Sequence, residues 1–434
     1  MKSLILLALS FTILFCRIGL AIPVFATDIE KTFKTAKKEK KPLLVEFYGI
    51  WCPPCNELEE TVFETQAFVK KAKPFKLLRV DADKKASWQL KDRYKIGGYP
   101  TLLFTRPDGK EIFRVVGYRT AKELFRTMDM VLAARESDVT DACQSDETEK
   151  LWRCALVCRE RKDIPCAERA FKKLEGKVEP ASIRFQEARE FFVEHAPTAD
   201  LKRNGYERLL EQFPASPKAI GWSLDYLELL EEQKGLVPKR KLIETVLSYY
   251  SVIAADPRTE ELGGTLSELA EYRALILEKL GEKERAKVAW IEAAALFQKA
   301  ADELFDSPAR GFTLERIFCL ERAGNLEAAL KLSRAYQQKY PHEFTFYFST
   351  ASLLDRAKHY QQAIKEAERA FELSYGDNRI RAATLLVHLY GALANKDAAK
   401  KIYEQTKKEF QPEGLEVRTH RYLEKLDAAW RKLS

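Results

Sequence analysis

Two cysteines separated by a pair of prolines, Cys52 and Cys55, are the residues of this 434-residue chain best suited to chemistry. A Cys-x-x-Cys pair can exchange disulfides, supply two ligands to zinc, or form a purely structural bridge. Residues 27–138 contain no further cysteine and no histidine, so a zinc ion would lack its other two ligands. A bridge that closes so short a loop restricts the unfolded chain very little. The pair therefore predicts thiol–disulfide exchange.

The segment around the pair predicts where each sulfur lies. Residues 43–48 form a nearly continuous apolar run, typical of a central strand, and a helical pattern follows Cys55. Cys52 is expected where the strand ends and the helix begins, so that unpaired N–H groups and the helix dipole favour its thiolate. Cys55, one turn along, is then placed to attack a mixed disulfide. Pro54 falls in the first helical turn, where a missing N–H costs nothing.

The elements that must position these sulfurs follow from the hydrophobic pattern of residues 27–138. Their order is helix, strand, helix, strand, helix, two strands and helix, which indicates an α/β fold with a mixed sheet covered by helices. Helices are expected at 28–38, 56–72, 87–94 and 121–132, and strands at 43–48, 77–80, 101–105 and 111–116.

This order, and the residues at its corners, resemble the thioredoxin superfamily over residues 27–138. Within the superfamily the segment is most similar to the C-terminal thioredoxin domain of the DsbD-type thiol–disulfide interchange reductases. The Pro-Pro dipeptide is similar to that of the TlpA-like periplasmic reductases. The segments that carry the resemblance are 41–48, Trp51 with the Cys-x-x-Cys pair, Glu59, and 96–101.

The resemblance implies roles for the residues nearest the sulfurs. Cys52 would be the nucleophile and Cys55 the resolving cysteine of a redox disulfide. The bond before Pro100 would be cis, leaving the backbone of Tyr99 and the side chain of Trp51 to contact an extended substrate; the alternative is an ordinary trans proline that starts a strand.

Two glutamates are expected to act on the same pair. Glu46 matches the family's buried acid, so burial should raise its pKa and it could relay the proton of Cys55; the alternative is an ion pair with Arg79 on the adjacent strand. Glu59, one turn after Cys55, would tune the cysteines; the alternative is a solvated position on a helix face.

Residues 1–26 are typical of a secretory signal peptide. Lys2 supplies a positive start, residues 4–15 are apolar, and Val24-Phe25-Ala26 suits a cleavage site before Thr27. We expect a periplasmic or otherwise exported protein, or a membrane-anchored one if this segment is not cleaved. Export would place the remaining cysteines where disulfides persist.

Residues 139–434 are helical by composition and periodicity, and the last part repeats. Gly324-Asn325 with Ala329 recurs as Lys358-His359 with Ala363 and as Ala394-Asn395 with Ala399. With Pro341 twelve residues after Ala329, residues 310–412 resemble tetratricopeptide repeats. We therefore expect a cysteine-rich helical hairpin at 139–180 and a tetratricopeptide-like solenoid at 181–434, whose concave face binds a peptide or protein partner.

Four further cysteines fall within the predicted hairpin, Cys143, Cys154, Cys158 and Cys166. Cys158 and Cys166 flank a turn, so a bridge between them is plausible and Cys143 would then pair with Cys154. Four cysteines allow three connectivities, and the spacing does not select one. Structural disulfides are expected; a second redox-active pair and a metal site are the alternatives. Cys319 occupies an apolar helical position and is expected to be a buried free thiol.

The charge balance is weak for a chain of this size, with 73 basic and 65 acidic residues. No nucleic-acid motif accompanies it, so no nucleic-acid partner is expected. Neither a metal nor a cofactor is expected. The sequence predicts an exported enzyme that exchanges disulfides with protein clients, acting as a reductase supplied by a membrane electron donor. The alternative is a redox-sensing tetratricopeptide scaffold or chaperone without turnover.

Overall fold

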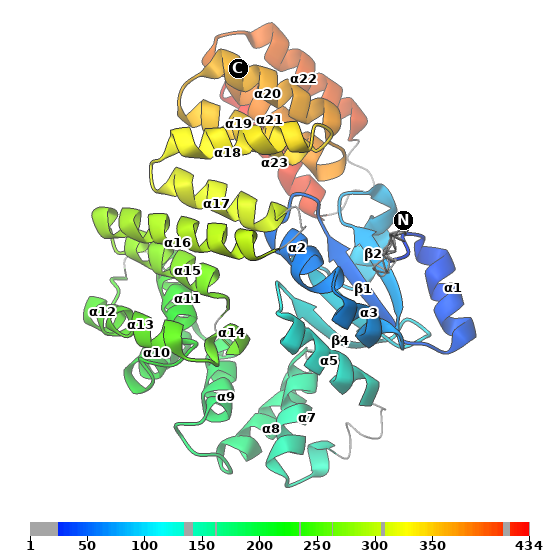
Figure 1. The fold of residues 1–434 in the computed structure, drawn as a ribbon, viewed down its shortest axis with the longest axis vertical. Helices are drawn as coiled ribbons and strands as arrows, with labels where there is room; N and C mark the ends of the chain where they lie inside the picture. Colours follow the sequence, from blue (N-terminus) through cyan, green and yellow to red (C-terminus); the bar gives the residue numbers. More distant parts are fainter. Residues whose placement is uncertain are drawn as a thin grey trace, which may run out of the picture.

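The computed structural model describes residues 25–133, 142–160, 163–233, 236–262, 264–304, 309–410 and 417–433. An α/β domain comes first, and the helical region that follows runs past it as an arc, from α7 and α8 at the bottom of Figure 1 to α22 at the top. Most of the expected signal peptide, residues 1–24, lies outside the described residues. Among the described residues, no helix combines the length and the apolar character needed to cross a membrane.

The domain is built on a four-stranded sheet with the order β2-β1-β3-β4. Strand β1 pairs parallel to β2 and antiparallel to β3, which pairs antiparallel to β4. The central strand β1 is buried over five of its six residues, because helices cover both faces of the sheet. The strands are β1 (Leu43–Tyr48), β2 (Lys76–Asp81), β3 (Thr101–Thr105) and β4 (Glu111–Val116), which confirms the four expected strands.

The helices of this domain agree with expectation except at one place. The single helix expected over residues 56–72 is wrong: α2 (Pro53–Leu58) continues into a π turn (Glu59–Phe63), and a new helix, α3 (Gln66–Ala72), follows. Thr65 starts α3, since its side chain accepts a hydrogen bond from the Phe68 N–H at 3.2 Å. The other helical segments are α1 (Ile29–Glu39), a 3₁₀ turn (Lys85–Ser87), α4 (Trp88–Arg93) and α5 (Ala121–Ala133).

Residues just before α1 belong to the sheet edge. Ala26 forms a parallel bridge with Leu78, donating its N–H to Leu77 at 3.0 Å and accepting one from Arg79 at 2.8 Å. The Phe25 ring lies 4.9 Å from that of Phe63, between ring centroids. Cleavage before Thr27 would therefore remove two residues that pair with and pack on the domain.

The helical region consists of antiparallel helices that pack on their neighbours. Its bounds are α7 (Thr148–Glu160), α8 (Ile164–Glu175), α9 (Ile183–Glu194), α10 (Ala199–Gln212), α11 (Ala219–Glu232), α12 (Arg240–Ser248), α13 (Tyr250–Ala255), α14 (Thr259–Leu262), α15 (Leu266–Lys279), α16 (Lys283–Glu303), α17 (Arg310–Arg322), α18 (Leu326–Lys339), α19 (Phe344–Arg356), α20 (Tyr360–Leu373), α21 (Gly376–Ala392), α22 (Lys396–Glu409) and α23 (Val417–Arg431). This solenoid-like arrangement confirms the predicted fold class.

The internal repeat has a structural counterpart in the last three helix pairs. Each turn between the two helices of a pair contains one residue in the left-handed region, at φ 79°, 60° and 56° for Gly324, Lys358 and Ala394. The next residue of each turn precedes the second helix, and the repeated alanine follows on its buried face. Those alanines are Ala329, Ala363 and Ala399, all fully buried.

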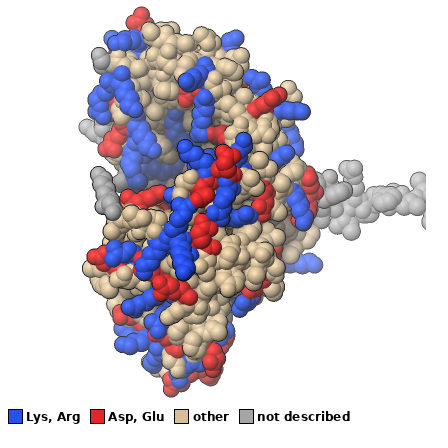
Figure 2. All heavy atoms as spheres, turned by 90° about the vertical axis from the view of Figure 1, so that its left-hand side faces the viewer, with Lys and Arg blue, Asp and Glu red and all other residues tan. Residues whose placement is uncertain are grey.

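Basic and acidic side chains are interspersed over the face drawn in Figure 2. Lys and Arg gather around a hollow in the upper half of that face, with Asp and Glu beside them. This mixture agrees with the weak net charge of +8.

Candidate functional site

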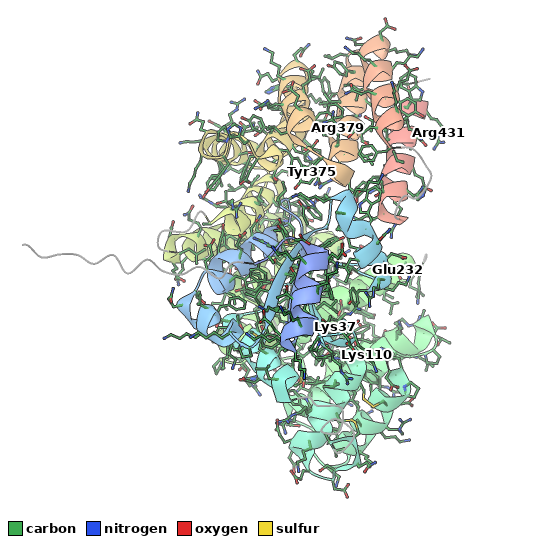
Figure 3. All side chains as sticks on the ribbon, turned by 90° about the vertical axis from the view of Figure 1, so that its right-hand side faces the viewer. Lys37, Lys110, Glu232, Tyr375, Arg379 and Arg431 are labelled. Carbon is green, nitrogen blue, oxygen red and sulfur yellow. A yellow bond between two sulfur atoms is a disulfide. The ribbon has the colours of Figure 1, made fainter. Side chains whose placement is uncertain are left out.

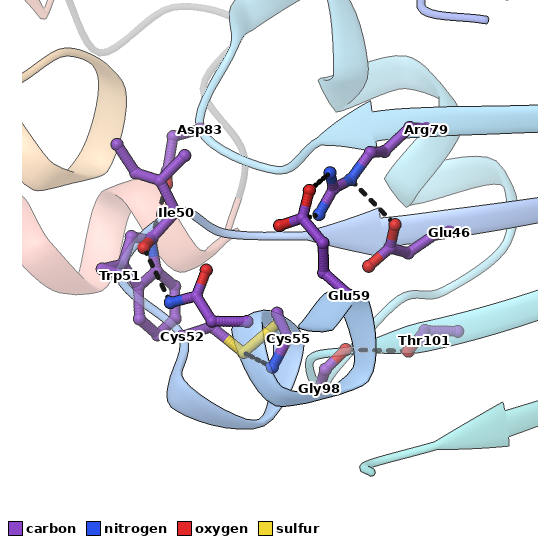
Figure 4. The surroundings of a disulfide bond; sticks show 11 residues. Glu46, Ile50, Trp51, Cys52, Cys55, Glu59, Arg79, Asp83, Gly98 and Thr101 are labelled. Carbon is purple, nitrogen blue, oxygen red and sulfur yellow. Dashed lines mark hydrogen bonds and ion pairs between the residues drawn. A yellow bond between two sulfur atoms is a disulfide. The ribbon is translucent and has the colours of Figure 1, made fainter. Parts of the chain in front are cut away.

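The two cysteines of the Cys-x-x-Cys pair form a disulfide at the point where β1 leads into α2 (Figure 4). Cys52 is the N-cap residue of α2, and its sulfur accepts a hydrogen bond from the Cys55 N–H at 3.2 Å. Pro53 and Pro54 occupy the first helical positions, where no N–H is needed. A reduced Cys52 would hold its thiolate against the same N–H and the positive end of the helix. Local geometry thus suits the Cys52 sulfur for attack on a disulfide.

Both sulfur-bearing residues are nevertheless buried. Cys52 is 1% exposed and Cys55 is fully buried. In an exchange enzyme the attacking sulfur must meet a client, so the elements packed beside the pair bear on access to it. The helical region is one such neighbour, because α17 packs on α2 and Arg381 and Arg418 lie over the Trp51 ring.

The expected substrate-contacting residues lie together beside the pair. The bond between Tyr99 and Pro100 is cis, and the Tyr99 ring meets that of Trp51 edge to face, with centroids 6.0 Å apart. The Thr101 hydroxyl donates to the Gly98 carbonyl at 2.8 Å and fixes the turn before β3.

Beside the disulfide lie one arginine and two glutamates, of which Glu46 is buried and Arg79 and Glu59 are partly buried (Figure 4). Glu46 is fully buried on β1, with Oε2 2.9 Å from Arg79 Nε on β2. Burial raises the pKa of Glu46 to about 7, although the Arg79 charge acts in the opposite direction. The ion pair with Arg79 is thus present together with a carboxyl able to hold a proton near neutral pH.

Glu59 does not lie on a solvated helix face. Arg79 Nη1 donates to its Oε1 at 2.6 Å, and Arg310, from the start of α17, donates to its Oε2 at 3.1 Å. Burial alone would raise the pKa of Glu59, but the two guanidinium groups lower it below its ordinary value. Glu59 therefore holds a negative charge one turn after Cys55.

The sequence reasoning missed the residues that meet the pair from outside the domain. Trp51 Nε1 donates to Asp83 Oδ2 at 2.6 Å, and Asn378 Nδ2 donates to the same oxygen at 2.7 Å. Arg418 Nη1 lies 3.8 Å from Asp83 Oδ1, and the Tyr375 hydroxyl donates to Asp81. Figure 3 places Tyr375 where the C-terminal helices meet the α/β domain. No local pattern could reveal these contacts, since the partners are about 300 residues apart in the chain: 295 for Asp83 and Asn378.

The four cysteines of the hairpin cluster are placed together, away from the first pair in the sequence. The structure joins Cys143 to Cys154 and Cys158 to Cys166. All four sulfur atoms lie within 4.8 Å of one another. All four are in disulfides here, and their reduced sulfurs would be close enough together to hold a metal ion. Cys319, on α17, is a buried free thiol whose pKa is raised by burial.

The strand order, the helices on both faces and a dithiol at a helix N-terminus beside a cis-proline define a thioredoxin-like domain. In agreement, residues 29–132 match the sequence family of thioredoxin-like domains. The domain and its Cys52–Cys55 pair support a redox function.

Known proteins resemble parts of the chain. Over 107 residues the chain is 25% identical to the thiol:disulfide interchange protein DsbD of Campylobacter jejuni, a match that covers 24% of this chain and 19% of the relative. Over 111 residues it is 33% identical to the chloroplastic thioredoxin-like protein HCF164 of Oryza sativa, covering 25% and 41%. A tetratricopeptide repeat protein from Parabacteroides merdae is 16% identical, with a TM-score of 0.37, and the match covers 64% of this chain and 98% of that structure. The chain thus spans about a fifth of the DsbD relative's length and two fifths of that of HCF164.

Proposed function

We propose that this protein is an exported thiol–disulfide oxidoreductase that exchanges disulfides with protein clients through Cys52 and Cys55. The observation that carries the proposal is the position of Cys52 at the N-terminus of α2, with the Cys55 N–H directed at its sulfur. The interchange function in the name of the DsbD relative supports the same activity. We propose the reducing direction, with electrons supplied by a membrane donor, and a partner recruited by the helical repeats.

The chemistry starts from the reduced pair. The Cys52 thiolate attacks one sulfur of a client disulfide, forming a mixed disulfide and releasing the other client sulfur as a thiolate. Cys55, after giving up its proton, attacks Cys52 and releases the second client thiolate. Two electrons and two protons pass to the client, and the Cys52–Cys55 disulfide that the structure contains is restored.

The neighbouring residues have supporting roles in this proposal. Glu46 accepts the proton of Cys55, since a carboxyl with a pKa of about 7 is half ionised near neutral pH. Glu59 restrains Arg79 and tunes the pair, while Trp51, Tyr99 and Pro100 contact the client backbone. The disulfides Cys143–Cys154 and Cys158–Cys166 are structural.

The test is reduction of insulin by dithiothreitol with the whole protein. We expect the wild type to accelerate it and Cys52→Ser to be inactive, while Cys319→Ser, which removes a buried thiol, behaves as wild type. Cys55→Ser should accumulate mixed disulfides through Cys52 on a non-reducing gel. Equal rates for wild type and Cys52→Ser would contradict the enzyme assignment.

A second candidate is a redox-sensing scaffold, favoured by the burial of Cys52 and by the packing of α17 on α2. It predicts partner binding that depends on the oxidation state of Cys52 and Cys55, without insulin reduction. Binding that is equal for the oxidised and reduced protein would contradict it.

A further inference from the structure

The helical region reaches the dithiol through three helices, α17, α21 and α23, which we call the cover. The cover contacts the thioredoxin-like domain at two places, one on α2 and one on the loop after β2. Figure 4 shows C-terminal helices beside Trp51, and Figure 1 shows α17 and α23 next to α2 and the sheet.

The first contact brings the start of α17 onto α2. The Arg310 N–H donates to Glu60 at 2.9 Å, and its guanidinium reaches Glu59 at 3.1 Å. Gly311 follows, and a Cβ at this position would lie 2.4 Å from Glu57 Cγ and 2.6 Å from the Pro53 carbonyl oxygen. The two helices approach so closely that only a glycine fits between them.

The second contact joins α21 and α23 to the loop after β2, where Asp83 accepts a hydrogen bond from Trp51. Asp83 accepts hydrogen bonds from both Trp51 and Asn378, at 2.6 and 2.7 Å. The Arg418 guanidinium lies 4.9 Å from the centre of the Trp51 ring and 5.0 Å from that of Tyr99. At Gly376 a Cβ would lie 2.0 Å from the Asp83 carbonyl oxygen. The cover thus occupies the side of the dithiol on which Trp51 and Tyr99 lie.

We propose that the cover decides which disulfides reach Cys52, with Gly311, Gly376 and Arg418 as the specificity-determining residues. This inference rests on the proposed function and adds a condition to it. A protein disulfide needs the helices to move away, whereas a small disulfide or alkylating agent needs a smaller opening. The chain therefore favours small thiol reagents while closed and accepts protein clients when the cover is displaced.

The experiment measures alkylation of Cys52 in the reduced full-length protein by iodoacetamide and by a maleimide–polyethylene glycol of protein size, with peptide mass spectrometry to identify the residue. Gly311→Ala forces α17 away from α2, and its matched control is Gly221→Ala, a helical glycine with no neighbour within 4 Å of an added Cβ. Gly376→Ala also strains a backbone at φ +55°, so its control is Gly324→Ala, at φ +79° with no such neighbour. Gly311→Ala and Gly376→Ala are the two wedge variants.

We expect both wedge variants to raise the rate with the large reagent about tenfold or more and to change the rate with iodoacetamide much less, since local opening controls access. The two control variants should match the wild type. Arg418→Ala, which removes contacts without adding atoms, should act in the same direction if a glycine variant does not fold. Wild-type Cys52 that reacts with the large reagent as fast as the wedge variants do would overturn the inference.

Failure of the inference can be told apart from failure of the proposed function. Alkylation requires only an accessible thiol. Faster alkylation of the wedge variants without insulin reduction would support the inference that the cover controls access to Cys52 and would contradict the proposed enzyme activity. Insulin reduction at one rate by the wild type, the wedge variants and their controls would support the enzyme activity and contradict the inference that the cover controls access.

Discussion

Glu46 combines complete burial with an ionisable group, and its surroundings explain how the fold tolerates it. Arg79 lies 2.9 Å away and is itself held by Glu59, so one guanidinium serves two carboxyls. Desolvation outweighs this attraction, which is why the pKa of Glu46 rises from 4.5 to about 7. The resemblance to the thioredoxin superfamily already predicted a buried acid here, because Glu46 matches the family's acid on the central strand.

The raised pKa predicts a pH-dependent stability. Above pH 4.5 the unfolded chain gives up the Glu46 proton, while the folded protein keeps it until about pH 7, so the free energy of unfolding falls over this range and then levels off. Glu46→Gln removes this loss. Relative to wild type, the free energy of unfolding of the variant should rise by about 2 kcal/mol between pH 5 and pH 8. This value follows from ~1.4 kcal/mol for each unit of pKa difference.

Urea unfolding at the two pH values measures this difference. The exposed Glu232, at the end of α11, provides the control Glu232→Gln, which should show no pH-dependent gain. An equal effect of Glu46→Gln at pH 5 and pH 8 would show that Arg79 keeps Glu46 ionised throughout.

At the scale of elements, the strands were predictable and one helix boundary was not. Each strand is a short apolar run, so burial in the sheet marks its ends in the sequence. Residues 56–72 carry a helical pattern throughout. That pattern does not predict the π turn at Glu59–Phe63 or the start of a new helix, α3, after Thr65. The repeats were predictable because an alanine follows five residues after Gly324, Lys358 and Ala394, at intervals of 34 and 36 residues.

The repeat turns predict a stabilising substitution. Asn325 and Asn395 cap α18 and α22 by accepting hydrogen bonds from backbone N–H groups at 3.3 and 3.1 Å. His359 occupies the equivalent position before α20 and makes no such bond. His359→Asn should therefore raise the free energy of unfolding by about 0.5–1 kcal/mol, and Asn395→Ala should lower it by about 1 kcal/mol.

Chemical unfolding at fixed pH checks both changes. His342→Asn, which alters a histidine outside the described helices, should leave the midpoint unchanged. A His359→Asn variant no more stable than wild type would mean that the turn at Lys358 cannot present an asparagine cap.

The disulfide between Cys143 and Cys154 leads to a further prediction about the stability of the helical hairpin. Cys143 and Cys154 are 11 residues apart, so their disulfide restricts the unfolded chain. Replacing both with alanine should cost about 2–3 kcal/mol of stability by the loop-closure argument. Denaturant unfolding under non-reducing conditions measures the cost, and under strong reduction the difference from wild type should disappear.

At the scale of the whole molecule, the sequence predicted two kinds of fold but not their association. The contacts between the cover and the thioredoxin-like domain join residues at least 250 positions apart, from 250 for Glu60 and Arg310 to 295 for Asp83 and Asn378 and beyond. Such pairs leave no periodic or local signal. Gly311 and Gly376 must stay small at this interface, but a single glycine in a sequence is equally compatible with a turn, a helix end or an open surface position. The two glycines therefore could not have predicted the interface before the helices were placed.

The interface also holds a group of carboxyls. Glu57 on α2 is buried and faces Glu315 on α17 together with Glu268 and Glu271 on α15. Within the described part of the chain no ion pair joins Glu57, Glu271 or Glu315 to a lysine or arginine, whereas nearby Glu60 pairs with Arg310. The other ionisable groups close to these carboxyls include Tyr118, Glu123, Asp225, Tyr272 and Cys319. Burial, followed by the neighbouring carboxyls, raises the pKa of Glu57 well above its ordinary value, that of Glu271 to about 7 and that of Glu315 to about 8.

These protonated carboxyls predict that the cover loosens as the pH rises. Glu57 on α2 lies against Glu315, Glu268 and Glu271 of the helical region, so its ionisation would place like charges across the interface, and docking favours its protonated form. Docking therefore becomes less favourable as the pH rises and Glu57 loses its proton. Glu315→Gln removes one of the carboxyls that face Glu57 and should keep the cover closed at a higher pH.

Small-angle scattering between pH 6 and pH 9 measures the radius of gyration and does not depend on the thiolate of Cys52. The radius of the wild type should increase with pH, and that of Glu315→Gln should increase less. The control Glu327→Gln, which changes an exposed residue of α18, should follow the wild type. A wild-type radius of gyration that is constant up to pH 9 would mean that ionised carboxyls are accommodated at the interface, and the cover would then have to be opened by a partner rather than by loss of protons.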